Sequence, residues 1–342
     1  MHIPDSLNVQ WHITNRCNQR CLHCYQKEYD DNEPSFSDLL FILEQIKKFV
    51  VLCKKNSKKK DLKAQITLTG GEPFIRDDFI LLLEKIHSIK PLFKFAILSN
   101  STLINNSILT KLQDLKPSYF QVSIDGNNKS HDYIRGQGNH QKVIQSIRKL
   151  IKYDIPTIIS FTSHQYNYLD FPDVAKLGRS LKVKRVWADR LVPMGNATLQ
   201  KMKLTKKNTQ EFFKIMYNER KKAQQSLFCK TEISMNRALQ FLIAGGRPYH
   251  CTAGDRLINI MPNGDLYPCR RMPIKVGNLF DNSLIDLYQN SILFNHLRDN
   301  EKIPSECKGC FYAHYCKGGL KCLSYAETDD PFNSDPGCWL IN

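Results

Sequence analysis

The chain has 342 residues, of which 42% are hydrophobic and 24% charged, so it is not a disordered tail and has room for about two domains. No segment approaches the roughly 18 uninterrupted apolar residues of a membrane helix, and the amino terminus lacks the basic start and apolar stretch of a secretory signal. We therefore expect a soluble, cytoplasmic protein without membrane contact. Lys and Arg outnumber Asp and Glu by 49 to 33, a formal net charge of +16 that often marks contact with nucleic acid, anionic membrane or acidic substrate.

Twelve cysteines are the second unusual feature of the composition. In a reducing cytoplasm so many thiols are more often metal ligands or redox centres than disulfide partners. Each deprotonated ligand would add a negative charge that the formal count omits. The protein with its metals bound would therefore be less basic than +16 suggests.

Up to about residue 192, short β-rich runs alternate with helix-length amphipathic stretches, which is typical of strand and helix units around a parallel sheet. The pattern predicts strands at residues 8–14, 64–69, 93–99, 119–124, 157–162 and 185–192. Helices are predicted near 35–54, 77–89, 105–115, 139–153 and 170–181. Six units are too few for a closed eight-fold barrel.

Residues 205–245 are interpreted as two further helices that end at a Gly-Gly-Arg-Pro stop, residues 245–248. Beyond this stop the composition changes, because seven of the twelve cysteines lie in residues 251–338. The expected organisation is an α/β domain at 1–200, bridging helices at 201–248 and a small cysteine-rich domain at 249–342.

The first group of cysteines, Cys17, Cys21 and Cys24, directly follows the first predicted strand. Three thiolates at this spacing can hold three irons of a four-iron cluster and leave the fourth iron open to another ligand. The alternatives are a redox pair or a zinc site. Zinc would normally need a fourth nearby Cys or His, for which His23 is a candidate.

Polar motifs end the next three strands and would emerge on the same rim as these cysteines. Paired glycines let the backbone approach a ligand closely, and Glu72 offers a carboxylate to an amino group. Taken singly, each motif also fits a turn or a strand end, but their joint placement favours one pocket. The motif residues are Gly70, Gly71, Glu72, Pro73, Ser99, Asn100, Ser123, Asp125 and, a little further on, Arg135.

At this point the sequence resembles the radical S-adenosylmethionine (SAM) superfamily over residues 8–192. The family's C-x3-C-x2-C motif matches Cys17, Cys21 and Cys24, with Tyr25 as the customary aromatic, and its Gly-Gly-Glu-Pro motif matches residues 70–73. The resemblance implies a partial (β/α)6 TIM-like barrel in which Glu72 and the neighbouring backbone bind the amino group of SAM. It further implies ribose and carboxylate contacts from Ser99, Asn100, Ser123, Asp125 and Arg135. One departure is Ser101, where relatives often have Gly.

The carboxy-terminal cysteines form a second pattern, in which Cys-x2-Cys spacing also fits zinc knuckles of a nucleic-acid-binding protein. Seven ligands do not complete two four-cysteine zinc sites. The pattern resembles the SPASM extension of radical SAM enzymes, which holds two auxiliary four-iron clusters and would bring the total to three. The resemblance implies an inner set, Cys251, Cys269 and Cys322, and an outer set, Cys307, Cys310, Cys316 and Cys338.

The SPASM resemblance leaves two features open. Five residues separate Cys316 from Cys322 where family members usually have three, and the inner set has only three cysteines. The inner cluster would therefore have an open iron, or a fourth ligand from Asp255 or the substrate. Of the two remaining cysteines, Cys53 falls in a long helix as an inert buried thiol, whereas Cys229 is either structural or a hydrogen-atom donor at the barrel mouth.

The resemblance implies reductive cleavage of SAM to a 5′-deoxyadenosyl radical that removes a hydrogen from a peptide or protein, most simply in the maturation of a ribosomally made peptide. An electron donor such as flavodoxin or ferredoxin is expected. Because few residues precede the first strand, leader recognition would need a separate protein or the barrel itself. Relatives that oxidise sulfatases usually have Asp where this chain has Arg270, and the basic pair Arg270 and Arg271 would instead hold a carboxylate.

Two alternatives remain from the sequence. Within enzymes, the alternative is a small-molecule radical dehydrogenase or carbon–carbon bond former. From a different class, a zinc-dependent nucleic-acid-binding protein would explain the charge but leaves Gly-Gly-Glu-Pro without a purpose. The lysine-rich residues 54–60 join a helix to a strand, on the barrel face away from the motifs, and are interpreted as a solvated loop.

Overall fold

The computed structural model describes residues 1–27, 29–30, 33–58, 62–199, 201–226, 228–299 and 301–341. Within them, one ten-stranded sheet runs in the order β10-β9-β8-β1-β2-β3-β4-β5-β6-β7. All six predicted strands are present, each within two residues at either end, and neighbouring strands from β1 to β7 are parallel. They are β1 (Ser6–His12), β2 (Lys63–Thr69), β3 (Lys94–Ser99), β4 (Phe120–Ser123), β5 (Thr157–Ser163) and β6 (Arg185–Arg190).

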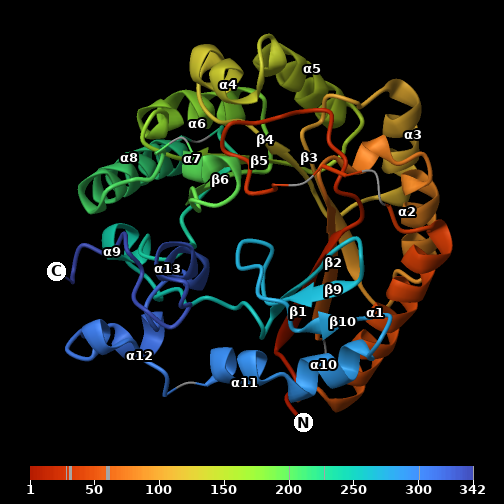
Figure 1. Ribbon diagram of the computed structural model, residues 1–342. Helices are drawn as coiled ribbons and strands as arrows, with labels where there is room; N and C mark the ends of the chain where they lie inside the picture. The colour runs from red at the N-terminus through yellow and green to blue at the C-terminus, as the bar shows by residue number, and fades with distance from the viewer. Residues whose placement is uncertain are drawn as a thin grey trace.

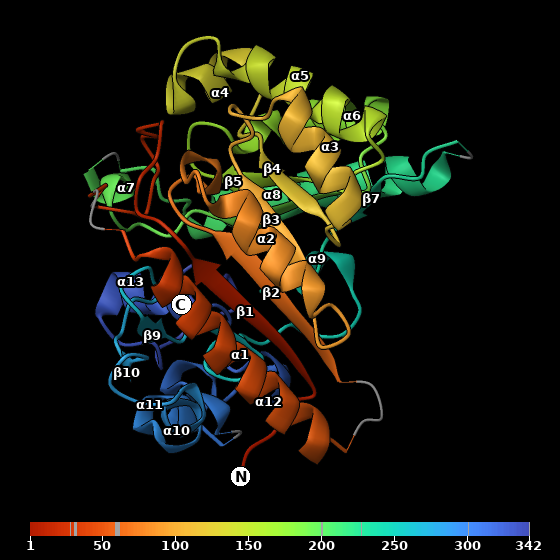
Figure 2. The same cartoon turned by 90° about the vertical axis from the view of Figure 1, so that its right-hand side faces the viewer.

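The five predicted helices of the amino-terminal half are also present and lie on the outside of the curved sheet (Figures 1 and 2). They are α1 (Phe36–Asn56), α2 (Phe79–Ser88), α3 (Asn106–Leu115), α5 (Asn139–Lys152) and α6 (Phe171–Ser180). The first of them begins at a capping box, in which Ser35 and Asp38 satisfy each other's backbone N–H groups. Short elements that the pattern did not predict are α4 (Asn128–Arg135), α7 (Asn196–Leu199) and the 3₁₀ turns η1 (Pro73–Ile75) and η2 (Tyr168–Asp170).

The prediction of two helices over 205–245 is wrong in part. A long helix, α8 (Lys206–Gln225), is followed by a strand, β7 (Glu232–Ser234), and then by the single turn α9 (Phe241–Ala244). Strand β7 pairs in parallel with β6, Glu232 opposite Arg185, and buries Ile233. This segment therefore extends the barrel sheet at the edge of β6.

The carboxy-terminal segment joins the same sheet at its other edge. Strand β8 (Leu257–Ile260) pairs in parallel with β1, and β9 (Asp265–Tyr267) and β10 (Gly277–Asn278) continue as antiparallel strands. The Phe49 ring of α1 lies 4.6 Å from that of Tyr288, so both parts share one apolar core. The remaining elements are α10 (Leu284–Asn290), α11 (Ile292–Arg298), η3 (Ser305–Cys307), α12 (Ala313–Cys316) and α13 (Lys321–Thr328).

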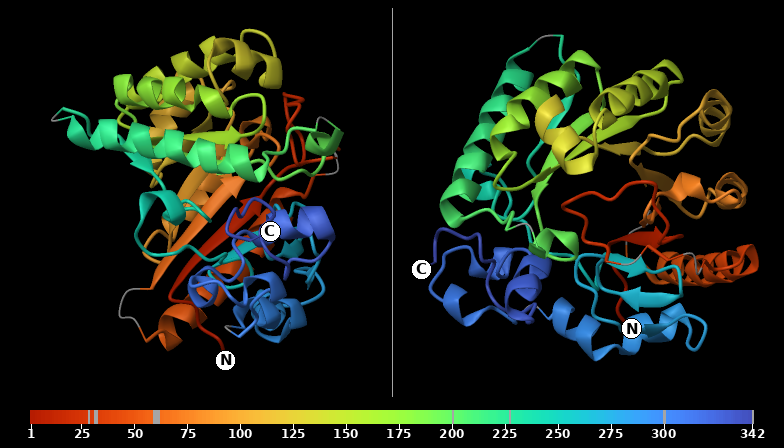
Figure 3. Two further views of the ribbon diagram at one scale, coloured as in Figure 1. Left: turned by 90° about the vertical axis from the view of Figure 1, so that its left-hand side faces the viewer. Right: turned by 45° about the horizontal axis from the view of Figure 1, so that its top comes forward.

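The sheet is an open arc rather than a closed barrel. Figure 1 shows the helices α1 to α8 around the arc and the carboxy-terminal segment, in blue, at its open side, and Figure 3 shows that segment beside β1. Of the predicted lysine loop, Lys54 and Lys55 belong to α1, whereas Lys59 and Lys60 lie outside the described residues. Among the described helices, none is both long and apolar enough to cross a membrane.

Candidate active site

The loop after β1 carries Cys17, Cys21 and Cys24 at the carboxyl end of the parallel strands. It is held there by backbone hydrogen bonds, among them Cys24 N–H to Cys21 C=O at 3.1 Å and Leu22 N–H to Ile134 C=O at 3.0 Å. The three thiols lie close enough to act electrostatically on one another. Burial raises the pKa of Cys17 to about 11 and also raises the pKa of Cys21, so a bound metal would be needed to make these two thiols thiolates.

The paired glycines at the end of β2 serve this loop rather than only a ligand. A Cβ on Gly70 would lie 2.6 Å from the Thr14 carbonyl oxygen, and one on Gly71 would lie 2.2 Å from that of Arg16. The N–H of Gly71 donates to the Thr14 carbonyl at 2.9 Å. The glycines are thus required because the β2 end packs directly against the cysteine loop, while both also line the large cavity.

Glu72 lies beneath the cysteine loop and is fully buried. Its carboxylate accepts hydrogen bonds from Ser99 Oγ at 2.9 Å, Asn100 N at 2.8 Å and Phe74 N at 3.2 Å. Burial raises the pKa of Glu72 to about 7, although these hydrogen bonds oppose the shift. The next residue, Pro73, begins η1 and is buried. The site therefore holds a preorganised carboxyl group close to Cys17.

Asp125 differs from the expected ribose contact, because its oxygens are used inside the protein. It accepts hydrogen bonds from Arg135 Nε at 2.6 Å and Thr162 N at 2.8 Å and lies 2.9 Å from His23 Nε2. Burial alone raises the pKa of Asp125, but the Arg135 and His23 charges outweigh it and hold the pKa well below its usual range. Asp125 thus positions Arg135, whose Nη1 lies 3.8 Å from Cys21 Sγ.

His23, the residue considered for a zinc site, meets Asp125 through its Nε2, whereas its Nδ1 has no hydrogen-bond partner among the described residues. Of the other predicted contacts, the cavity is lined by Ser99, Asn100, Ser123 and Arg135 together with Tyr25. Ser101 adopts a left-handed backbone, φ 62°, a conformation that Gly adopts without strain.

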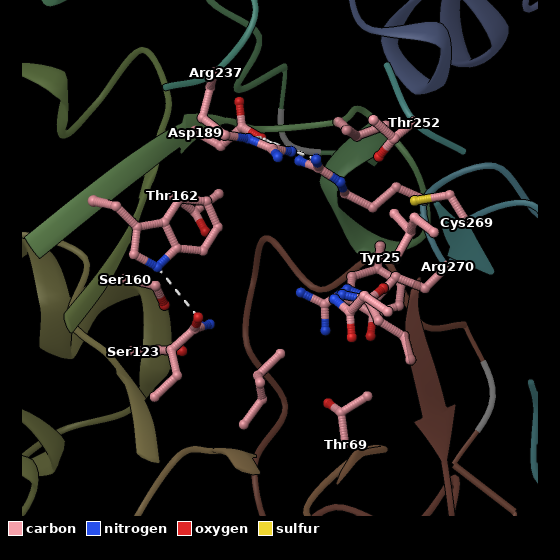
Figure 4. Close-up of a pocket in the computed structure, with 18 of the residues that line it drawn as sticks. Tyr25, Thr69, Ser123, Ser160, Thr162, Asp189, Arg237, Thr252, Cys269 and Arg270 are labelled. Atoms are coloured by element: carbon pink, nitrogen blue, oxygen red, sulfur yellow. Dashed lines mark hydrogen bonds and ion pairs between the residues drawn. The ribbon is translucent and has the colours of Figure 1, made fainter. Parts of the chain in front are cut away.

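A cavity of about 1230 Å³ lies inside the arc, between the barrel strands and the carboxy-terminal segment. In Figure 4, Ser123 and Ser160 lie on one side of it and Tyr25 and Arg270 on the other, with Cys269 of the inner set beyond. Arg and Lys outnumber Asp and Glu among its lining residues. The cavity is therefore a cationic chamber that joins the first cysteine set to the inner set.

Asp189, at the end of β6, is a cavity residue that the sequence analysis missed. Its carboxylate accepts hydrogen bonds from Arg237 and Arg271, both at 2.9 Å. Burial alone raises the pKa of Asp189, but these guanidinium groups outweigh it and keep the carboxylate ionised. The position at the end of a parallel strand was the one available signal.

The two residues of the predicted basic pair, Arg270 and Arg271, have different partners. Arg271 is neutralised by Asp189, whereas Arg270 lies over the Tyr25 ring at 5.3 Å and has no carboxylate partner among the described residues. Figure 4 shows Arg270 directed into the cavity beside Tyr25. Arg270 is thus a cation that is available to a ligand.

The carboxy-terminal cysteines gather as the two expected sets. Electrostatic contacts link Cys251, Cys269 and Cys322. The outer set, Cys307, Cys310, Cys316 and Cys338, lines a single small cavity. All twelve cysteines are free thiols.

The donor sets fit clusters that spread their ligands over several iron atoms. Among the described residues, no three His, Cys, Asp or Glu side chains converge closely enough to hold one metal ion.

Asp255 Oδ1 lies 2.7 Å from His2 Nε2, so its carboxylate is already engaged. Burial lowers the pKa of Lys321, while negative charge on Cys251, Cys307 and Cys316 opposes the lowering.

The expected position of Cys229 at the barrel mouth is wrong. Cys229 precedes β7, whose first residue, Glu232, pairs with the first residue of β6. It therefore lies at the amino ends of the strands, opposite to the cysteine loop. It lines a separate cavity with Arg220 and Met235. The missed strand β7 caused this error. Helix α8 carries the chain back to the amino ends of the strands, and Cys229 lies there because β7 starts from that end.

Two models of protein families match the chain. The model of the Radical SAM superfamily matches residues 11–178, and that of SPASM, an iron-sulfur cluster-binding domain, matches residues 251–311. The second match begins at Cys251 and ends just after Cys310. The cysteines that follow, including Cys322 with its longer spacing, lie beyond it.

Curated proteins are similar to this chain over nearly its whole length. An AdoMet-dependent heme synthase of Methanosarcina barkeri is 24% identical over 354 aligned positions, which cover 96% of this chain and 95% of that protein. A PqqA peptide cyclase of Bradyrhizobium diazoefficiens is 24% identical over 348 positions, which cover 98% of this chain and 86% of that protein.

Solved structures share the fold. SuiB of Streptococcus suis bound to S-adenosylmethionine has a TM-score of 0.75 at 19% identity, over 98% of this chain and 77% of SuiB. The structure of anSMEcpe with bound AdoMet has a TM-score of 0.73 at 19% identity, over 97% of this chain and 90% of that one. At such identities the likeness concerns the fold.

Proposed function

The chain belongs to the radical SAM superfamily and carries a SPASM iron–sulfur domain, and we propose that it is a peptide maturase that removes a hydrogen atom from a ribosomally made peptide or protein. Cys17, Cys21 and Cys24 would hold the cluster that binds SAM, and the inner and outer sets would hold two auxiliary four-iron clusters. When bound, the clusters would supply one-electron chemistry, and reductive cleavage of SAM to methionine would supply the 5′-deoxyadenosyl radical that takes the hydrogen.

The residues around the cysteine loop would bind and orient SAM. Glu72 would bind the amino group together with the neighbouring backbone of Gly70 and Gly71, which lines the cavity, and Arg135, held by Asp125, would attract the carboxylate. Ser99 and Asn100 hold Glu72 in place through 2.9 and 2.8 Å hydrogen bonds. Fixing SAM in this way would leave its reactive part facing the cavity, which restricts the radical to one C–H bond.

One observation carries the proposal for a peptide substrate: a single cavity joins the SAM-binding rim to the inner cysteine set. Its volume of about 1230 Å³ exceeds the roughly 300–1,000 Å³ of ordinary small-molecule pockets, so it has room for SAM and a peptide segment together. The PqqA peptide cyclases and SuiB, which was solved with its precursor peptide SuiA, support a substrate of this kind.

The charge of the cavity supports a substrate with an acidic group near the modified residue. Arg270 is the lining cation that stands beside Tyr25, close to the cysteine loop, with no carboxylate partner among the described residues. A substrate carboxylate placed there would gain a charge-assisted hydrogen bond in a partly enclosed site. Arg237 and Arg271 are less suited, because both already donate to the Asp189 carboxylate.

A second candidate is a small carboxylated molecule, as in the alternative radical dehydrogenase or carbon–carbon bond former. Its support is the same cationic wall, together with the similarity to the heme synthase of Methanosarcina barkeri. Because carboxylates of either substrate class would fit Arg270, turnover rather than binding separates the two.

The proposal includes partners and a location. An electron donor of the flavodoxin or ferredoxin type would supply the electron, and a separate protein would bind a peptide leader. We place the reaction in the cytoplasm, because cysteines that serve as cluster ligands need a reducing compartment.

The test is anaerobic incubation of reconstituted protein with SAM, dithionite and the peptides encoded beside its gene. We expect 5′-deoxyadenosine together with a change in the mass of one peptide, read by mass spectrometry. The matched control is the triple variant Cys17→Ala, Cys21→Ala, Cys24→Ala. The second candidate would be favoured if 5′-deoxyadenosine formed without a substrate and product appeared only when a carboxylated small molecule was added.

A further inference from the structure

Lys321 is a buried cation in the interior of the carboxy-terminal segment. The residue is 7% exposed, and its Nζ has no hydrogen-bond partner among the described residues. It is the first residue of α13, directly before Cys322. A buried ammonium group is strongly unfavourable unless an anion lies near it. The surroundings of Lys321 must therefore be negative when the protein is complete.

The groups around Lys321 come from both auxiliary cysteine sets. Lys321 and Cys251 of the inner set line one small cavity, and Lys321 Nζ lies 5.6 Å from the centre of the Phe332 ring. Electrostatic contacts link the ammonium group to Cys251 and to Cys307 and Cys316 of the outer set. The backbone N–H of Lys321 hydrogen-bonds Cys251. Lys321 thus offers the inner set two donors, its ammonium group and its backbone N–H, and offers the outer set only its ammonium group.

The segment between Cys316 and Cys322 explains this position. It crosses from the outer set to the inner set within the carboxy-terminal segment, between α12 and α13 (Figure 1). Lys317, Gly318 and Gly319 all have positive φ, at 52°, 81° and 79°, so the chain turns sharply there. The turn brings Lys321 back into the interior between the two sets.

We propose that Lys321 is a shared counter-cation of the two auxiliary clusters and raises the reduction potentials of both. The inference rests on the proposed function, which assigns one cluster to each set. A nearby positive charge stabilises the reduced form, because that form carries one more negative charge. Lys321 is a positioning residue in this role, since it would act through the cluster ligands and does not reach the substrate.

The experiment compares neutral and charged replacements at this position. Lys321→Met and Lys321→Gln remove the charge but keep the backbone N–H to Cys251, and Lys321→Arg keeps both. All are made in the Cys17→Ala, Cys21→Ala, Cys24→Ala background, so that only auxiliary clusters contribute. Reductive titration followed by electron paramagnetic resonance gives the two midpoint potentials without any measurement of activity.

The matched control is Lys317→Met. Lys317 lines the same small cavity as Lys321, but its charge interacts with Asp255 and Asp299 rather than with the thiols. The Lys317→Met variant therefore removes one lysine charge from the same region while leaving the groups around the clusters in place.

We expect Lys321→Met or Lys321→Gln to lower both midpoint potentials. The expected change is about tenfold in the ratio of reduced to oxidised cluster, which corresponds to about 59 mV for a one-electron couple. Lys321→Arg and Lys317→Met should change them much less. Unchanged potentials in the neutral variants, or a shift of only one cluster, would overturn the proposal. If Lys321→Met does not assemble both clusters, Lys321→Gln carries the same measurement.

The iron content separates this inference from the proposed function. About eight irons per chain in the parent triple variant would support both auxiliary clusters. A parent without them contradicts the proposed function itself. A parent with them, and neutral variants with unaltered potentials, contradicts only the role of Lys321.

Discussion

Arg190 and Asp335 form a bidentate ion pair, with Nη1 to Oδ1 at 2.7 Å and Nη2 to Oδ2 at 2.6 Å. Arg190 ends β6, whereas Asp335 lies three residues before Cys338 of the outer set. Both side chains are nearly completely buried, at 4% and 1% exposure. Asp335 also accepts the N–H groups of Leu320 and Gly337. The pair therefore ties the barrel sheet to the segment that carries the outer cysteines.

Asp335→Asn should destabilise the protein strongly, because it leaves the Arg190 guanidinium buried without a counter-charge. We expect a loss of about 3–5 kcal/mol in the free energy of unfolding, measured by urea denaturation of the metal-free protein. The control is Glu232→Gln, which breaks the exposed 2.7 Å pair with Arg185 and should cost less than about 1 kcal/mol. Equal losses in the two variants would contradict the importance of the buried pair.

Replacing Cys17, Cys21 and Cys24 together by Ala should abolish SAM cleavage and leave the auxiliary clusters in place, because the sets lie in separate parts of the chain. Iron should fall from about twelve to about eight per chain. Iron analysis and quantification of 5′-deoxyadenosine check this. Persistent 5′-deoxyadenosine would show that SAM is cleaved elsewhere.

Glu72→Gln should weaken SAM binding at least about tenfold, since the amide keeps the shape but loses the charge that accepts the amino group. Because the pKa of Glu72 is about 7, the carboxylate is ionised above that pH and becomes protonated below it. The affinity of the wild-type protein should therefore fall as the pH is lowered through 7. Equilibrium dialysis with SAM at several pH values checks both points. A wild-type affinity independent of pH in this range would refute the role of Glu72.

Arg270→Gln should raise the KM for an acidic peptide by roughly tenfold and change kcat little, because the lost interaction holds the substrate equally before and during the reaction. Steady-state kinetics on the peptide identified by mass spectrometry provides the measurement. Arg148→Gln, on the exposed face of α5, is the matched control. A peptide in which the acidic residue is replaced by its amide should lose affinity for the wild type but not for Arg270→Gln.

Cys229→Ser should leave 5′-deoxyadenosine formation and peptide turnover unchanged, because Cys229 lies at the amino ends of the strands and lines a different cavity. Product analysis by mass spectrometry, run beside the wild type, checks this. A variant that cleaves SAM normally but no longer forms product would return Cys229 to the role of hydrogen-atom donor.

The sequence by itself determined the six strands of the arc and the polar motifs at their carboxyl ends. These features depend on local properties, namely the alternation of apolar residues along a strand and the turn chemistry that follows it. Cys17, Gly71, Glu72 and Asn100 could therefore be assigned to one rim without coordinates. The grouping of the later cysteines was likewise expected, and the structure brings each set together.

Only the tertiary structure decided what these groups face. Strand β8 pairs with β1 although strands β2 to β7 lie between them in the sequence, and Cys229, just before β7, lies at the amino ends of the strands. Which carboxylate meets which guanidinium followed from the same long-range packing, so that Asp189 neutralises Arg271 and leaves Arg270 to the cavity. Such pairings join residues far apart in sequence, and their partners are chosen by burial and register rather than by any local pattern.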